Sequence, residues 1–467
     1  MKLSFFNCAT IIGIFFILVQ QLIVASSTAI IAQLSQSILS GAGYLLWLVL
    51  FVISLTIVYI PTMLTNHFIN KAKYFTYKDY ISKFSKQAYN HPNKFFDSNF
   101  RKEKEAYFTH EAWLIIQEDY NFIVDIVGIV LNVVLNVLVL SIYLDWFFLF
   151  SYILAVPLTF ACATASKTRL LKKSDKLQKS RNEMLQTLSY GWDTILLGNK
   201  WNVSLWKNKF EKRSDSADIH QRRLSLEIDV MSTITLFVSA FPILMVLFMS
   251  FFNAKDDIQK LAMLVATAPR QVLTIQYLSE IINLFVNLND KVRRTKQLSA
   301  NLVFDKDTST LDSRIIWGSV FIKSPETKTA IHCFDNIIKA TNNFEKGRFT
   351  ITGDNGTGKT TLLANIKSKM GDKAYILPSQ SRIAFQNDDQ ERGFSTGEKL
   401  RENFKEISLN VCDGSCSVLL LDEWNANLDK ENIDSINTDI DKISKDICII
   451  EVLHLPASTM CANLSGR

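Results

Sequence analysis

The sequence predicts an all-α membrane domain of six spans at residues 1–300, followed by an α/β domain at residues 301–467. Uncharged runs long enough to cross a bilayer fill much of the first part. In the second part, strand-like runs alternate with helical ones around a glycine-rich loop. The composition agrees, because 48% of the 467 residues are hydrophobic, which is high for a soluble protein.

The opening of the chain predicts two spans. No Asp, Glu, Lys or Arg occurs between Leu3 and Asn70, and one helix needs only roughly 20 residues to cross a bilayer. A polar patch at residues 33–43 divides this run, and further apolar stretches follow. The expected spans lie at about residues 8–31, 43–64, 122–144, 146–166, 229–252 and 261–289.

Two of these spans leave an alternative open. Span one could be a cleavable signal peptide, because Lys2 and an apolar core precede Ala25, but the apolar stretch is long and we expect an uncleaved span. Span six contains Arg270 and Glu280, and charges within a membrane are candidates for function. They could equally pair with polar neighbours for structure, so the sequence leaves their role undecided.

The charges of the loops predict the orientation of the spans. Residues 71–104 hold nine Lys or Arg and residues 167–223 hold fourteen, whereas residues 33–43 hold none. Positively charged loops stay on the cytoplasmic side, so both long loops and everything after Lys291 are expected there. The second loop is rich in Lys, Glu, Gln and Leu, which predicts that spans four and five continue as helices to a break or short helix near residues 190–199. Residues 90–97 form a matching break in the first loop.

The glycine-rich loop follows the apolar Phe349 and Ile351 and precedes an amphipathic helix. It matches G-x-x-x-x-G-K-[ST] through Gly353, Asp354, Asn355, Gly356, Thr357, Gly358, Lys359 and Thr360. Glycines let the backbone amides wrap around phosphates, the lysine adds a charge on the β- and γ-phosphates, and the Thr360 hydroxyl can ligate Mg²⁺. The helix that starts at Thr361 adds the positive end of its dipole. This pattern predicts a nucleotide site.

A buried strand at residues 417–423 ends in two acids. Asp422 is placed to hold the water shell of Mg²⁺, and Glu423 to orient or deprotonate an attacking water. All seven cysteines are expected to be reduced or buried thiols, because no second Cys/His pair stands at zinc-finger spacing.

With these motifs in order, the chain resembles an ABC transporter, specifically a half-transporter of the exporter type. Residues 394–401, FSTGEKLR, resemble the family's L-S-G-G-Q-x-x-R signature, and residues 422–429, DEWNANLD, are similar to D-E-A-T-S-A-L-D. His454 follows an apolar strand as the family's switch histidine does, and Gln380 resembles the Q-loop glutamine. Six spans with two long cytoplasmic loops match the exporter membrane domain, and the loop breaks match its coupling helices.

The resemblance implies roles for these residues. The catalytic residues would be Glu423 and His454. ATP would be contacted by Ser395, Gly397 and Glu398. Mg²⁺ would be bound by Thr360, Gln380 and Asp422. ATP would lie between the phosphate loop of one subunit and the signature of the other, so a second half-transporter subunit is expected, in a homodimer. An integral protein of the bacterial inner membrane with a cytoplasmic cassette is implied. It would export an unidentified substrate (peptide, lipid or drug-like), and no nucleic-acid partner is expected.

The sequence departs from the family pattern in places. Gln380 and Ser395 are only fifteen positions apart, where the family usually inserts a longer helical subdomain. Phe321 and Phe334 are the candidates for the adenine-stacking aromatic, and neither matches the family pattern well. The shortened cassette motivates an alternative function, a membrane-anchored ATP-binding sensor or regulator that moves no substrate.

Overall fold

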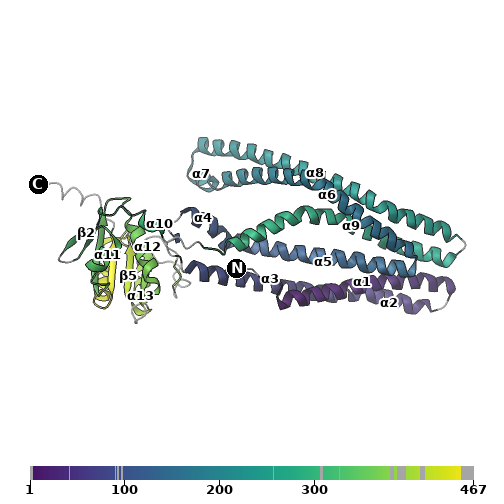
Figure 1. Ribbon diagram of the computed structural model, residues 1–467, viewed down its shortest axis with the longest axis horizontal. Coiled ribbons are helices and arrows are strands. Elements are labelled where there is room, and N and C mark those ends of the chain that lie inside the picture. The colour runs from purple at the N-terminus through teal and green to yellow at the C-terminus, as the bar shows by residue number, and fades with distance from the viewer. Residues whose placement is uncertain are drawn as a thin grey trace. The chain divides into compact units, whose positions relative to one another are not determined.

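The computed structural model describes residues 4–41, 43–89, 91, 94–95, 98–255, 257–304, 309–324, 327–378, 383–385, 396–410, 416–426 and 428–453 (Figure 1). The chain divides into two compact units. One comprises Met1–Ile81 with His110–Ala300, and the other comprises Ser82–Thr109 with Asn301–Arg467.

Helices, most of them long, build the first unit. They are α1 (Cys8–Ser40), α2 (Tyr44–Ile57), α3 (Tyr59–Tyr89), α5 (Ala112–Tyr143), α6 (Trp146–Leu188), α7 (Gly191–Leu197), α8 (Lys200–Asn253) and α9 (Ile258–Ala300). The last turns of α3 belong to the second unit. Helix α1 packs against α2, α5 and α9, and the long pair α6 and α8 run side by side (Figure 1).

Side-chain caps and glycines set the ends of these helices. Helix α1 begins where the side chain of Asn7 accepts a hydrogen bond from the backbone N–H of Thr10, and it ends at Gly41, whose φ of 71° suits glycine. The polar patch at residues 33–43 therefore does not end the helix at residue 31. Helices α6 and α8 extend far beyond their apolar segments and are joined through α7, which confirms the continuous helices and the short helix predicted there.

Within the residues that the structure describes, four helical segments are long and apolar enough to cross a membrane. They are Cys8–Ser40, Tyr44–Tyr89, Lys104–Tyr143 and Lys200–Asn253, and Trp146–Cys162 is a shorter apolar segment. Each of the six predicted ranges is helical, the second one across the α2–α3 junction. Six membrane spans remain a prediction, since among the described residues α9 is not one of these segments and α6 contributes only the shorter one.

Helix α2 exposes apolar side chains along most of its length. Its 14 residues, YLLWLVLFVISLTI, are strongly apolar, and Ser54 is the only buried residue among them. Leu45 and Leu46 expose 66% and 63% of their surface. Continuous exposed apolar surface of this kind marks an interaction with lipid or protein.

The second unit contains a six-stranded sheet in the order β2-β1-β3-β6-β5-β4. The strands are β1 (Val320–Lys323), β2 (Lys328–Ile331), β3 (Gly347–Gly353), β4 (Ala374–Pro378), β5 (Val418–Asp422) and β6 (Cys448–Val452). Strands β3, β6, β5 and β4 are parallel, and β1 pairs antiparallel with both β2 and β3. The helices are α4 (Ser98–Ala106), α10 (Ser309–Asp312), α11 (Phe334–Ala340), α12 (Lys359–Met370), α13 (Thr396–Asn410) and α14 (Lys430–Ile443).

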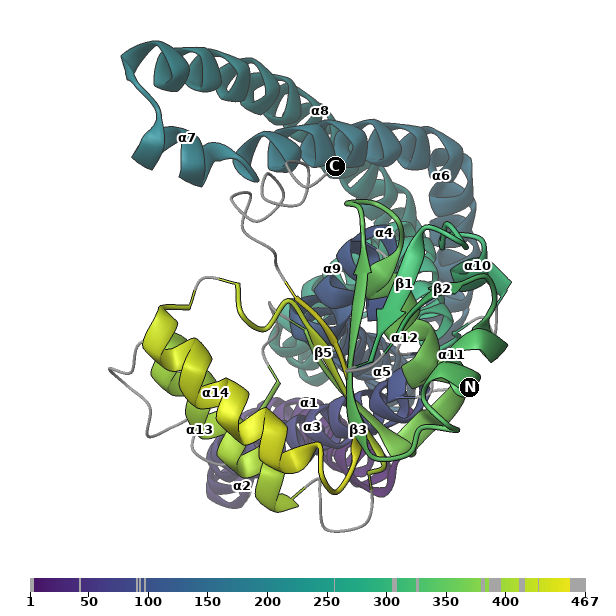
Figure 2. The same cartoon turned by 90° about the vertical axis from the view of Figure 1, so that its left-hand side faces the viewer.

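Helices cover both faces of this sheet (Figure 2). All five residues of β5 are buried, and alternate side chains point to opposite faces. Leu420 belongs to one hydrophobic cluster with residues of α12 and α11, and Leu421 belongs to a second cluster with residues of α13 and α14. The α/β class expected for residues 301–467 is thus present, with the carboxyl ends of the parallel strands at one edge.

Candidate functional site

The glycine-rich loop connects β3 to α12, as its sequence predicts. Gly356 and Gly358 have φ values of 83° and 92°, in the left-handed region that favours glycine. A Cβ atom on Gly358 would lie 2.8 Å from the carbonyl oxygen of Arg314, so no other residue fits without a shift of the backbone. The loop therefore has the tight curvature that lets backbone amides approach a phosphate.

Lys359 is the first residue of α12. Its ammonium donates to the carbonyl oxygens of Gly353 and Asp354, at 2.8 Å and 3.0 Å. The charge is thereby held inside the loop, at the N-terminal end of a helix, where an anion is also favoured by the helix dipole.

Thr360 and Asp422 meet at the carboxyl edge of the sheet. The Thr360 hydroxyl lies 3.0 Å from each carboxylate oxygen of Asp422 and donates to that carboxylate. Burial raises the pKa of Asp422, the Thr360 hydrogen bond opposes this, and the neighbouring Glu423 charge raises the pKa further. A hydroxyl and a carboxylate so close together are the ligand types that Mg²⁺ takes beside a phosphate, so these residues fit the ion.

The backbone of Glu423 has a positive φ, which is unusual for a residue other than glycine. Its φ is 47°, a conformation that costs roughly 1–3 kcal/mol in a residue with a side chain. Its N–H donates to the carbonyl of Val452 at 2.8 Å, and the next residue, Trp424, is buried with its indole N–H donating to Glu451 at 3.0 Å. These two hydrogen bonds hold the backbone on both sides of the Glu423 side chain.

A buried ion pair lies behind this segment. Arg348 of β3 donates from Nε and Nη2 to the two carboxylate oxygens of Glu451, each at 2.8 Å, and also contacts Asp441. Burial alone would lower the pKa of Arg348, but the hydrogen bonds and charges of Glu451 and Asp441 outweigh it and raise that pKa. Sequence reasoning missed this pair. The available signal was one charge, of opposite sign, in each of two otherwise uncharged strands.

We expect Arg348→Met to destabilise the second unit strongly. The change leaves the Glu451 carboxylate buried without its guanidinium, a loss of roughly 3–5 kcal/mol. Thermal denaturation followed by tryptophan fluorescence would show a lower midpoint, which Arg348→Met with Glu451→Leu should partly restore. Arg293→Met is the matched control, because its partner Asp290 is exposed. Equal effects of Arg348→Met and Arg293→Met would contradict this account.

The predicted site residues divide into two groups. Gly353 to Thr361, Asp422 and Glu423 are described, and Thr360 directly contacts Asp422. Gly397 and Glu398 lie in the first turn of α13, which covers the opposite face of the sheet from α12. Gln380, Ser395 and His454 lie outside the described residues, so their roles stay predictions.

Two other expectations concern aromatic and sulfur side chains. Phe321 and Phe334 each have a lysine ammonium over the ring, that of Lys328 at 4.7 Å and that of Lys369 at 3.6 Å. Adenine stacking on either ring stays a prediction.

Within the described ranges, the five cysteines are free thiols, in agreement with the reading of the sequence; they are Cys8, Cys162, Cys333, Cys416 and Cys448.

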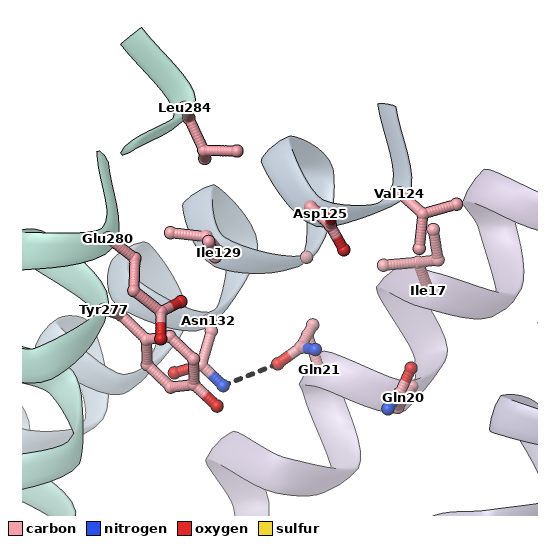
Figure 3. A pocket seen from close by; sticks show the side chains of 11 residues that line it. Ile17, Gln20, Gln21, Val124, Asp125, Ile129, Asn132, Tyr277, Glu280 and Leu284 are labelled. Atoms are coloured by element: carbon pink, nitrogen blue, oxygen red, sulfur yellow. Dashed lines mark hydrogen bonds between the residues drawn. The ribbon is translucent and has the colours of Figure 1, made fainter. Parts of the chain in front are cut away.

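The first unit contains a cavity of about 550 Å³ between α1, α5 and α9 (Figure 3). Asp125 and Glu280 line it together with uncharged polar and apolar side chains. Arg270 does not line it. That guanidinium donates instead to the hydroxyls of Thr28 and Ser27 on α1, at 3.0 Å and 3.2 Å. The structure thus separates the two charges of span six, with Arg270 tying two helices together and Glu280 facing a cavity.

The chain is similar to a solved structure described as a bacterial Atm1-family ABC exporter with ATP bound. The TM-score is 0.57 at 10% sequence identity, over 97% of this chain and 91% of that one. Neither a protein-family model nor a curated protein matches the sequence. At this identity the likeness establishes the fold alone.

Proposed function

We propose that this chain is an exporter-type ABC half-transporter that binds and hydrolyses ATP in order to move a substrate across a membrane. The observation that carries the proposal is the convergence of Lys359, Thr360 and Asp422 at the carboxyl edge of the sheet. Such an edge is where α/β folds bind their ligands. The fold of an ABC exporter and four helices apolar enough to cross a bilayer support the same conclusion.

The residues of the loop would bind the phosphates of ATP. The amides of residues 353–361 would wrap the β- and γ-phosphates, and the Lys359 ammonium would exchange its two backbone carbonyls for phosphate oxygens. Thr360 and Asp422 would hold Mg²⁺, which supplies charge neutralisation on the phosphates when bound. Gln380 would be the third residue that holds Mg²⁺.

Glu423 would orient the attacking water and accept its proton, with His454 as the second catalytic group. A carboxylate acts as a general base only when its position is fixed. The hydrogen bonds of Glu423 N–H and the Trp424 indole support that role, because they fix the backbone that carries this side chain.

A second copy of the chain would complete the nucleotide site. Ser395, Gly397 and Glu398 of the signature would face the phosphate bound by the opposite subunit. One chain carries one cassette, so we propose a homodimer embedded in the bacterial inner membrane, with six spans per subunit and both cassettes in the cytoplasm.

This topology predicts which residues an outside reagent can reach. After replacement of the native cysteines, a membrane-impermeant thiol reagent added to intact cells should label a cysteine introduced at Ser37 or Asp257. It should not label one at Lys94 or Lys200, because those residues lie in the loops rich in positive charge. Labelling at Lys200 before the cells are opened would overturn the orientation.

Reconstitution of the full chain in liposomes tests the function as a whole. We expect Mg²⁺-dependent ATP hydrolysis that rises in the presence of the transported substrate, together with accumulation of that substrate on the side opposite the cassettes. ATP binding without hydrolysis or transport would instead support the alternative, a membrane-anchored sensor or regulator.

A further inference from the structure

The cavity between α1, α5 and α9 is negatively charged (Figure 3). Asp125 comes from α5 and Glu280 from α9, and no Lys, Arg or His is among the lining residues. In the part of the chain that the structure describes, neither carboxylate has an ion-pair or hydrogen-bond partner. Ionisable groups in membrane helices are costly unless they are paired, so these two stand out.

Neighbouring charges of the same helices do have partners. Arg270 of α9 is tied to hydroxyls of α1, and Glu118 of α5 pairs with Lys291 and with Arg294, the latter at 2.6 Å. Among the residues that the structure describes, the two carboxylates of the cavity thus differ from these paired charges on the same helices. An incoming cation would stabilise the two carboxylates.

A buried chain of hydrogen bonds ends at the same cavity. Arg270 donates to Thr28 at 3.0 Å, and Thr28 donates to Asn136 at 2.9 Å. Asn136 donates to Asn132 at 3.2 Å, and Asn132 donates to Gln21 at 2.8 Å. Every bond runs in the same direction, so each donor polarises the next.

The last member of this chain, Gln21, still has a hydrogen to donate. Its residue is only 8% exposed and it lines the cavity, where Figure 3 shows its amide oxygen engaged by Asn132. Its amide nitrogen has no acceptor among the residues described. A ligand carbonyl in the cavity could therefore accept a hydrogen bond from this nitrogen. This observation is independent of the two carboxylates.

We propose that this cavity binds an organic cation that carries a hydrogen-bond acceptor near its charge. Asp125 and Glu280 would face the charge, and the Gln21 amide nitrogen would donate to the acceptor. The volume of about 550 Å³ is that of a small-molecule site. The assignment names the substrate class of the proposed export and rests on that function.

Two dyes with one ring framework test the charge preference. Rhodamine 123 is a cation with an ester carbonyl, and fluorescein methyl ester is its anionic counterpart. Fluorescence polarisation would be measured on the full chain in nanodiscs of zwitterionic lipid without ATP, with empty discs subtracted. We expect the wild-type protein to bind the cation at least roughly tenfold more tightly, which corresponds to about 1.4 kcal/mol. Equal binding of both dyes by the wild-type chain would overturn the proposal without any variant.

Variants then assign the effect to residues. Glu280→Gln should weaken binding of rhodamine 123 roughly tenfold, and Asp125→Asn combined with it should remove the preference for the cation. Gln21→Leu should weaken both dyes alike, because both carry the ester. Asp290→Asn, on the same helix but in an exposed pair with Arg293, is the control and should bind as wild type does. Wild-type affinity in Glu280→Gln, or an equal loss in Asp290→Asn, would refute the site.

The site and the proposed function can fail separately. Normal Mg²⁺-dependent ATP hydrolysis with no preference for the cation would reject the cavity as a cation site and leave the exporter intact. Cation binding in a chain that hydrolyses no ATP would support the cavity and reject the exporter.

Discussion

Glu423→Gln should abolish most ATP hydrolysis while ATP binding survives. The amide keeps the size of the side chain and its backbone hydrogen bond to Val452, but it cannot accept a proton from water. Loss of a general base lowers turnover by roughly 10²-fold or more. Hydrolysis would be measured by phosphate release and ATP binding by a fluorescent ATP analogue, both on the same preparation. These two assays separate the effect on turnover from the effect on binding.

The same variant distinguishes two roles for this carboxylate. If Glu423 served only to hold Mg²⁺, the amide would weaken nucleotide binding as well as turnover. Glu431→Gln, an exposed change in the first turn of α14, is the control and should leave both quantities unchanged. Full hydrolysis by the Glu423→Gln protein would remove Glu423 from the mechanism.

Lys359→Ala should weaken ATP binding and turnover together. The ammonium is held inside the loop by the carbonyls of Gly353 and Asp354, so it is positioned before a phosphate arrives. Its removal leaves the charge of the β- and γ-phosphates uncompensated, and loss of a charge-assisted hydrogen bond costs roughly 1.5–3 kcal/mol, or about tenfold or more in affinity.

Lys445→Ala is the matched control for this lysine. Its side chain is exposed beyond the end of α14, so ATP affinity should stay at the wild-type value. Unchanged ATP affinity in Lys359→Ala would mean that the glycine-rich loop does not hold the nucleotide.

The sequence predicted those parts of the fold that depend on local rules. A loop with fixed glycines can adopt few conformations, so the positions of Gly356, Gly358 and Lys359 follow from spacing alone. The continuous helices α6 and α8 follow from the Lys-, Glu- and Leu-rich composition of residues 167–223. The end of α1 did not follow, because polar residues such as Gln33 and Ser37 do not end a helix and the chain turns only at Gly41.

Interactions between distant segments could not be predicted in the same way. Arg348 and Glu451 are 103 positions apart, and their pairing depends on β3 lying beside β6. The different surroundings of Arg270 and Glu280 likewise depend on how α9 packs against α1 and α5. A single sequence indicates that such charges need partners, but the packing of the segments determines which residue becomes the partner.

One measurement tests most directly whether two copies of the chain enclose ATP. In the Glu423→Gln protein, cysteines would be introduced by Asn355→Cys in the phosphate loop and Thr396→Cys in the signature, and disulfide crosslinking between subunits would be followed with and without ATP. The account predicts a crosslinked dimer that forms only with ATP, and its loss when Ser395→Arg places a bulky cation against the phosphate. Crosslinking that does not depend on ATP would contradict the composite site and favour a regulatory role.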